Sequence, residues 1–171
     1  VEDANRAAGR GAGDYTDLQG FIFVSSAQAT TPFHIDAEEN ILIQIRGDKF
    51  VRTFDNGDRC LISEEDMEIS PSKHRNQRYE PWFEERATMH RLKPGDALHM
   101  PYMIPHWVST GETNSISMAM TWKTPEVKRL NKIRLMNGTL RRFGLPQPYE
   151  QLKKFTRGEA MTRDLMQGFI A

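Results

Sequence analysis

TPFHIDAEENILIQIRGDK, residues 31–49, is the stretch that decides the fold. His34 and Asp36 stand two residues apart near its start, and in an extended segment this spacing places both side chains on one face. His106, which follows Pro105 much later in the chain, supplies a second imidazole. Two histidines and one carboxylate can occupy one face of an octahedral metal ion and leave three positions open. The pattern therefore predicts a metal site formed by two distant segments.

The remainder of this stretch predicts two strands. Gly47-Asp48 is expected to form the two-residue turn of a hairpin between residues 41–46 and 49–54. Alternation along these strands places Lys49 on the same face as Gln44, opposite the face that carries the isoleucines and phenylalanines. A lysine on an inward face is costly unless it meets a polar ligand, so we expect Lys49 to face a bound anion. The alternative is a surface lysine on a hairpin of different register.

Length and composition bound the class of protein. A chain of 171 residues is the size of one domain and can bury a core of its own. The chain has 23 basic residues (Lys and Arg) and 23 acidic residues (Asp and Glu). It therefore has no excess positive charge that would favour binding to nucleic acid or an anionic membrane. Cys60 is the single cysteine, and no apolar run is long enough to span a bilayer. These features predict a cytoplasmic protein without membrane or nucleic-acid partners.

The rest of the chain predicts a mainly β fold. Residues 1–19 are expected to form a flexible lead-in, and residues 20–123 the barrel domain. Short apolar strands separated by turn signals, the pattern of a barrel or sandwich, occupy most of this domain. Residues 57–86 are polar and turn-prone, which predicts an insertion over one end of the barrel. Two roles are open for the insertion: a substrate lid, or a solvated loop without a function.

A helical extension is predicted for residues 124–171. Thr124 is a suitable N-cap, Pro125 suits the first turn, and Gly144 would end the helix. A second helix is predicted at about residues 159–167. These helices either cover the outside of the barrel or form a homodimer interface, and the sequence favours neither role.

Both segments that carry the predicted metal ligands resemble a known family. Gly95, Pro101 and His106 have the spacing of the second sequence motif of cupin barrels, and residues 31–49 are similar to the first motif. This stretch most resembles the JmjC-like cupin oxygenases, the family of the asparagine hydroxylase that inhibits the hypoxia-inducible factor. The similarity covers about residues 21–122. The shared positions in the first motif are Thr31, Pro32, His34, Asp36, Asn40, Gln44, Gly47 and Lys49.

This resemblance implies a fold and an activity. The fold is a double-stranded β-helix, the cupin or jelly-roll barrel, followed by C-terminal helices. The activity is that of an Fe(II)- and 2-oxoglutarate-dependent dioxygenase, a hydroxylase that uses O2 and converts 2-oxoglutarate to succinate and CO2 while it oxidises a substrate carbon. The substrate is a protein side chain or a small molecule, and the sequence does not choose between them.

The resemblance also implies roles for individual residues. The catalytic residues that hold Fe(II) in the family match His34, Asp36 and His106. The residues that bind the distal carboxylate of 2-oxoglutarate, and the one near its C1 carboxylate, match Lys49, Thr31 and Asn40. The remaining histidines match no position of the family and are expected to be surface or structural residues: His74, His90 and His99.

Three departures from the family pattern leave other functions open. Met103 stands where cupins usually have glycine, so we expect the loop that carries His106 to differ in shape. An apolar residue, Met118, Ala119 or Met120, replaces an asparagine near the metal on the last strand. A tyrosine that contacts 2-oxoglutarate in the hydroxylase lies upstream of the similar stretch and has no identifiable counterpart here. The alternatives are a non-catalytic cupin-like metal-binding or regulatory module, and a metal-dependent cupin enzyme that does not use 2-oxoglutarate.

Overall fold

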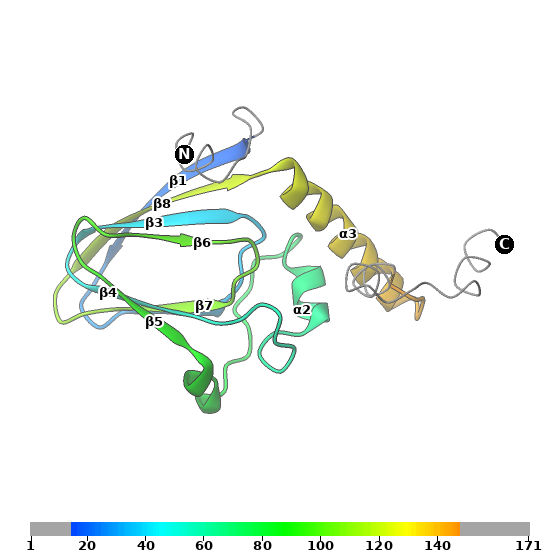
Figure 1. Cartoon of the computed structure of the whole chain (residues 1–171), viewed down its shortest axis with the longest axis horizontal. Coiled ribbons are helices and arrows are strands. Elements are labelled where there is room, and N and C mark those ends of the chain that lie inside the picture. Colours follow the sequence, from blue (N-terminus) through cyan, green and yellow to red (C-terminus); the bar gives the residue numbers. More distant parts are fainter. Residues whose placement is uncertain (1–14, 148–171) are drawn as a thin grey trace.

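The chain folds into two antiparallel four-stranded sheets that face each other (Figure 1). The computed structural model describes residues 15–147. The first sheet has the strand order β1-β8-β3-β6, and the second sheet has the order β2-β7-β4-β5. The prediction of a mainly β fold is confirmed. The strands are β1 (Thr16–Ser25), β2 (Thr30–His34), β3 (Glu39–Arg46), β4 (Lys49–Thr53), β5 (Thr88–Leu92), β6 (Ala97–Met100), β7 (His106–Thr110) and β8 (Ser115–Lys123).

The predicted hairpin at Gly47-Asp48 is wrong. β3 pairs with β8 and β6 in the first sheet, whereas β4 pairs with β7 and β5 in the second sheet. The two-residue link therefore crosses from one sheet to the other. Gly47 has a φ of 71°, and a Cβ at this position would lie 2.6 Å from the carbonyl oxygen of Asn114. The close approach of two chain turns requires glycine here, and it is not the signature of a hairpin.

The predicted faces of these strands are nevertheless correct. Gln44, Lys49 and Val51 are buried, whereas the alternate residue Ile45 is exposed. Alternation is a local property of extended backbone, so it survives an error about which strand is the partner. Lys49 therefore lies on the inward face, as the sequence predicted.

The N-terminal strand is longer than expected. β1 begins at Thr16, so residues 16–19 belong to the first sheet, and the prediction that they extend a flexible lead-in is wrong. Residues 1–14 lie outside the described part of the chain. β1 is the edge strand of the first sheet, and pairing with β8 holds it there although none of its residues is buried. Its weak burial explains why local sequence did not reveal its full length.

The segment between β4 and β5 covers one end of the outer face of the second sheet, whereas Met89 of β5 on the same face is 59% exposed. It contains α2 (Glu64–Ile69) and the 3-10 helix η1 (Pro81–Arg86). The Ser63 hydroxyl caps α2 by accepting a hydrogen bond from the Asp66 amide. A mainly aromatic cluster, called the aromatic cluster below, joins this segment to the sheet. Its buried members are Phe33, Phe54, Leu61 and Phe83.

Helix α3 (Pro125–Arg142) follows β8 and lies beside α2 (Figure 1). The predicted cap is confirmed, because the Thr124 hydroxyl accepts from the Val127 amide at 3.1 Å. Arg141 on α3 binds the buried Glu68 on α2 with two hydrogen bonds of 2.7 and 3.0 Å. The second predicted helix, residues 159–167, lies outside the described part of the chain. No helix among residues 15–147 is long and apolar enough to cross a membrane.

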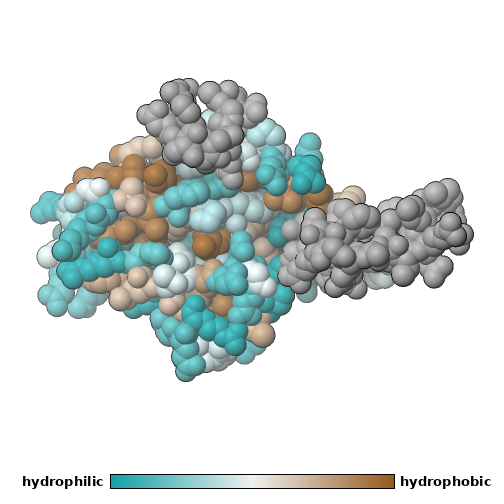
Figure 2. Space-filling view, in the orientation of Figure 1, coloured by the Kyte–Doolittle hydropathy of each residue, from teal (hydrophilic) through white to brown (hydrophobic). Residues whose placement is uncertain are grey.

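The outer face of the first sheet is apolar and exposed. Ile22 and Val24 of β1 are 72% and 76% exposed, and Ile45 of β3 is 50% exposed. Figure 2 shows hydrophobic surface gathered at the end of the molecule where these strands lie. No described element covers this face, in contrast to the second sheet.

Candidate metal centre

The three predicted metal ligands meet at one end of the second sheet. His34 ends β2 and His106 begins β7, and these two residues are direct cross-strand partners. Asp36 follows two residues after β2. One ligand atom from each of the three residues lies within 4.8 Å of the others. The register of β2 and β7 thus brings together two segments that are far apart in the sequence.

Both imidazoles are oriented by backbone carbonyl groups. The Nδ1 atom of His34 lies 2.7 Å from the Pro32 oxygen, and the Nδ1 atom of His106 lies 3.0 Å from the Ile104 oxygen. Each Nδ1 therefore donates its proton, and each Nε2 keeps a lone pair. The two Nε2 atoms lie 3.9 and 3.8 Å from Oδ2 of Asp36. These are the tautomers and orientations that a metal ion requires.

Burial keeps His106 neutral at physiological pH. The side chain is 3% exposed, and loss of solvation, followed by the neighbouring His34, lowers its pKa to about 4. Metal binding requires a neutral imidazole, so His106 needs no deprotonation before it can coordinate an ion.

Met103 anchors the loop that carries His106. Its amide donates to the carbonyl oxygen of Asp36 at 3.0 Å, so it ties together both halves of the ligand set. Its φ is 59°, in the left-handed region that glycine adopts most easily, and its side chain is fully buried against Ile35 and Ile62. The side chain at the position of the family's glycine thus contributes packing.

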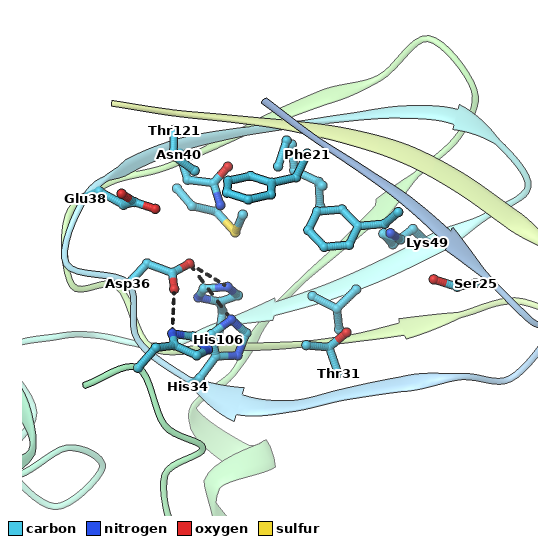
Figure 3. Close-up of a pocket in the computed structure, with 16 residues that line it drawn as sticks. Phe21, Ser25, Thr31, His34, Asp36, Glu38, Asn40, Lys49, His106 and Thr121 are labelled. Atoms are coloured by element: carbon cyan, nitrogen blue, oxygen red, sulfur yellow. Dashed lines mark ion pairs between the residues drawn. The ribbon is translucent and has the colours of Figure 1, made fainter. Parts of the chain in front are cut away.

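The metal ligands open onto a cavity of about 500 Å³ between the two sheets. All six residues that the sequence predicted for metal and cosubstrate line it, and Figure 3 labels each of them. The lining residues are Phe21, Phe23, Ser25, Thr31, His34, Asp36, Glu38, Asn40, Leu42, Lys49, His74, Met100, His106, Val108, Ala119 and Thr121.

Lys49 marks one end of this cavity, together with Thr31 and Ser25 (Figure 3). Lys49 is 5% exposed, and its amine donates to the Ser117 hydroxyl. Burial lowers its pKa from the ordinary value. Among the described residues, Lys49 has no acidic partner, although the Phe23 ring lies 5.7 Å away. A buried cation without a counter-ion is costly, and an anionic ligand would offset that cost.

Asn40 and Thr121 lie on the wall of the cavity formed by the first sheet. They are cross-strand partners on β3 and β8, and they are 8% and 4% exposed. Asn40 Oδ1 and Thr121 Oγ1 are buried without a hydrogen-bond partner. Of the three candidates for the apolar residue on the last strand, Ala119 is the one that lines the cavity. Unpaired polar groups in a cavity wall indicate a site for a polar ligand.

Sequence reasoning missed four polar residues that line the cavity: Ser25, Glu38, His74 and Thr121. His74 was predicted to be a surface or structural residue; its side chain is 64% exposed, yet its Nδ1 lies 3.5 Å from Oδ1 of Asp36. Glu38 also lines the cavity, and burial raises the pKa of its carboxyl group. His74 could not be found by pattern, because the contact depends on how the segment between β4 and β5 returns past β2. Glu38 shares the alternation of Asp36 and Asn40, which could have found it.

The other two histidines are structural, as predicted. His90 on β5 contacts the Thr53 hydroxyl at 3.0 Å within the second sheet. His99 on β6 contacts Glu39 at 2.9 Å and stacks on Trp122. Neither residue lines the cavity.

Comparisons with known proteins identify the class to which this fold and site belong. The model of the cupin-like domain family matches residues 3–127, and the chain therefore belongs to the cupin-like domain family. The two antiparallel sheets are the jelly-roll barrel of that family, so the predicted double-stranded β-helix is confirmed. No curated protein matches the chain.

Solved structures that resemble this chain include several cupins. The DMSP lyase DddQ of Ruegeria pomeroyi is 18% identical, with a TM-score of 0.41 over 66% of this chain and 40% of the lyase. A cupin superfamily protein of Desulfitobacterium hafniense is 15% identical, with a TM-score of 0.40 over 63% of this chain and 70% of that chain. A cupin-like protein of Thermotoga maritima is 18% identical, with a TM-score of 0.40 over 65% of this chain and 60% of that chain. The chain thus spans well under half the length of the lyase.

Proposed function

We propose that this chain is an Fe(II)- and 2-oxoglutarate-dependent oxygenase that hydroxylates its substrate. One observation carries the proposal: a cavity of about 500 Å³ contains both a His-Asp-His cluster and a buried lysine without an acidic partner among the described residues. The resemblance of residues 31–49 to the JmjC-like cupin oxygenases supports the same function. A metal centre alone would not need the lysine.

The donor set suits Fe(II). Two neutral imidazole nitrogens and one carboxylate oxygen are the ligands of the facial triad, which leaves positions for a chelating 2-oxo acid and for O2. His34, Asp36 and His106 would hold the ion, with both imidazoles fixed by carbonyl groups. When bound, iron and 2-oxoglutarate would together supply the activation of O2.

The remaining residues would bind and orient the cosubstrate. Lys49 and Thr31 lie at one end of the cavity and would bind the distal carboxylate, the first as a cation and the second as a hydroxyl donor. Asn40 lies on the opposite wall, where its amide would donate to the C1 carboxylate. Apolar side chains between these groups would exclude water. They are Phe23, Leu42, Val108 and Ala119.

Anaerobic titration tests this proposal directly. Purified protein loaded with Fe(II) should bind 2-oxoglutarate and develop a visible charge-transfer band. His34→Ala should abolish this band through loss of the metal, and Lys49→Ala should weaken 2-oxoglutarate binding while metal binding persists. Lys93→Ala removes an exposed lysine from the turn before β6 and is the matched control, which should leave both unchanged.

The same titration, together with an assay of succinate release, distinguishes the alternatives. Absence of Fe(II)-dependent 2-oxoglutarate binding, with no effect of His34→Ala, would refute the proposal. Metal binding that is indifferent to Lys49→Ala would favour a cupin enzyme that does not use 2-oxoglutarate. Binding of both ligands without succinate release in the presence of any substrate would favour a non-catalytic cupin-like module.

A further inference from the structure

The cavity has two chemically different ends. The proposed cosubstrate uses the Lys49 end and, at the other end, only the side-chain amide of Asn40. Figure 3 shows Lys49, Ser25 and Thr31 towards one end of the cavity, and Glu38, Asn40 and Thr121 at the other end, across the cavity from the metal ligands. Lys49 is cationic, and Glu38 is an acidic residue. An elongated dicarboxylate held by the metal would extend towards Lys49, because the Glu38 carboxylate repels it. The space beside Glu38 is therefore left for another molecule.

Three oxygen-bearing side chains converge at this second end, which we name the Glu38 subsite: Glu38, Asn40 and Thr121. Glu38 lies just before β3, Asn40 is on β3, and Thr121 is the cross-strand partner of Asn40 on β8. Thr121 Oγ1 and Asn40 Oδ1 are buried and make no hydrogen bond, although both side chains are more than nine-tenths buried. The Thr121 hydroxyl lies beside the Glu38 carboxyl group without completing a standard hydrogen bond. Such unpaired groups are expected where a ligand completes the pairing.

The Glu38 subsite lacks a cation of its own. Glu38 forms no ion pair within residues 15–147. Lys123, whose charge reaches Glu38, pairs with Asp17 at 3.7 Å instead. By contrast, the adjacent Glu39 is buried and contacts His99 at 2.9 Å on the opposite face of the sheet. Of these two neighbouring carboxylates, the one that faces the cavity forms no ion pair with a described residue.

We propose that the Glu38 subsite binds the cationic nitrogen group of the substrate, an amine-type group carried next to the carbon that is oxidised. A protonated nitrogen donates several hydrogen bonds and carries a positive charge that can pair with the Glu38 carboxylate. Thr121 and Asn40 supply further acceptor oxygens. This inference rests on the proposed function, because the metal and 2-oxoglutarate define which part of the cavity remains free. It adds to that function the chemical class of the substrate.

Paramagnetic broadening by Mn(II) tests the Glu38 subsite with probes of matched size. The full chain is loaded with Mn(II) and 2-oxoglutarate, and proton spectra of butylammonium, butyramide and butyrate are recorded with increasing protein. Butylammonium should be broadened most, because it binds near the ion, and butyrate should not be broadened. Glu38→Gln should weaken butylammonium binding by roughly tenfold or more, which is the expected effect of losing a charge-assisted hydrogen bond. Thr121→Val should weaken it less.

Glu39→Gln is the matched control for Glu38→Gln. It removes the same charge from the adjacent position but on the face that points to His99, so butylammonium binding should not change. Three results would overturn the inference: equal broadening of all three probes, equal binding of butyramide and butylammonium, or no effect of Glu38→Gln. The proposed function would stand in each case if the protein still binds 2-oxoglutarate. Failure of the wild-type protein to bind 2-oxoglutarate would refute the proposed function, and the inference with it.

Discussion

The two sheets that enclose the cavity differ in what lies on their outer faces. The segment between β4 and β5 covers one end of the second sheet, where Phe33 of the sheet and Phe83 of the segment are 2% and 4% exposed. The outer face of the first sheet has no described cover, and Ile22 and Val24 are 72% and 76% exposed. The same fold thus contains one sheet whose outer face is packed at the end that carries the metal ligands, and one that is packed on its inner face alone.

The two histidine ligands lie at the packed end of the second sheet, and Asp36 follows two residues after its strand β2. His34 follows Phe33 on β2, and His106 precedes Trp107 on β7, so each ligand alternates with a member of the aromatic cluster. Packing on the outer face fixes the strands, and the strands fix the imidazoles. The comparison teaches that the covering segment supports the metal centre from behind. The following predictions test this difference between the sheets.

Truncation of the aromatic cluster should have the largest effect on stability. Phe83→Ala in η1 should lower the free energy of unfolding by about 3 to 5 kcal/mol, because it opens a cavity among packed rings. Urea unfolding would measure the change. Phe143→Ala is the control, since this ring is 77% exposed and its loss should cost under about 0.5 kcal/mol. A cost below about 1 kcal/mol for Phe83→Ala would show that the cluster does not support the second sheet.

Removal of one imidazole should act on the metal and hardly at all on the fold. His34→Ala should weaken Mn(II) binding by on the order of 100-fold or more, because loss of even an outer-shell partner costs about 10- to 100-fold. Calorimetric titration would measure it. His90→Ala removes a histidine of the same sheet whose ring contacts the Thr53 hydroxyl and lies outside the cavity, so it should leave the affinity unchanged. Equal effects of the two substitutions would contradict a metal centre at His34.

Replacement of the buried lysine should stabilise the ligand-free protein. Lys49→Met should raise the free energy of unfolding at pH 7 by about 1 kcal/mol, since it removes a buried charge without a counter-ion. Burial lowers the pKa of Lys49 in the folded state, so the wild-type protein regains stability as pH rises through that lowered value towards the ordinary one. The difference between variant and wild type should therefore narrow between pH 7 and pH 10 in urea titrations. A constant difference would contradict this account.

Substitution on the exposed sheet face should have the smallest effect. Ile22→Ser on β1 should change the free energy of unfolding by under about 0.5 kcal/mol, because the side chain is 72% exposed in the structure. Thermal unfolding would measure it. A loss of about 2 kcal/mol or more would show that this face is covered in solution, which would remove the contrast between the sheets.

The sequence alone predicted much of the site, because alternation and capping are local. His34 and Asp36 share a face by the period of two, and Lys49 was placed inward even though its strand partner was misassigned. The Thr124 cap was likewise readable from a few neighbouring residues. Such features depend on backbone geometry within one segment.

Tertiary structure decided what depends on distant segments. The partners of β3 and β4, the full length of β1, and the approach of His74 to Asp36 all follow from long-range pairing that no short pattern encodes. The sequence by itself determined which chemical groups are available and which way neighbouring side chains point. Only the fold decided that two opposite ends of one cavity receive Lys49 and Glu38, because burial and electrostatic fields arise when separate strands come together.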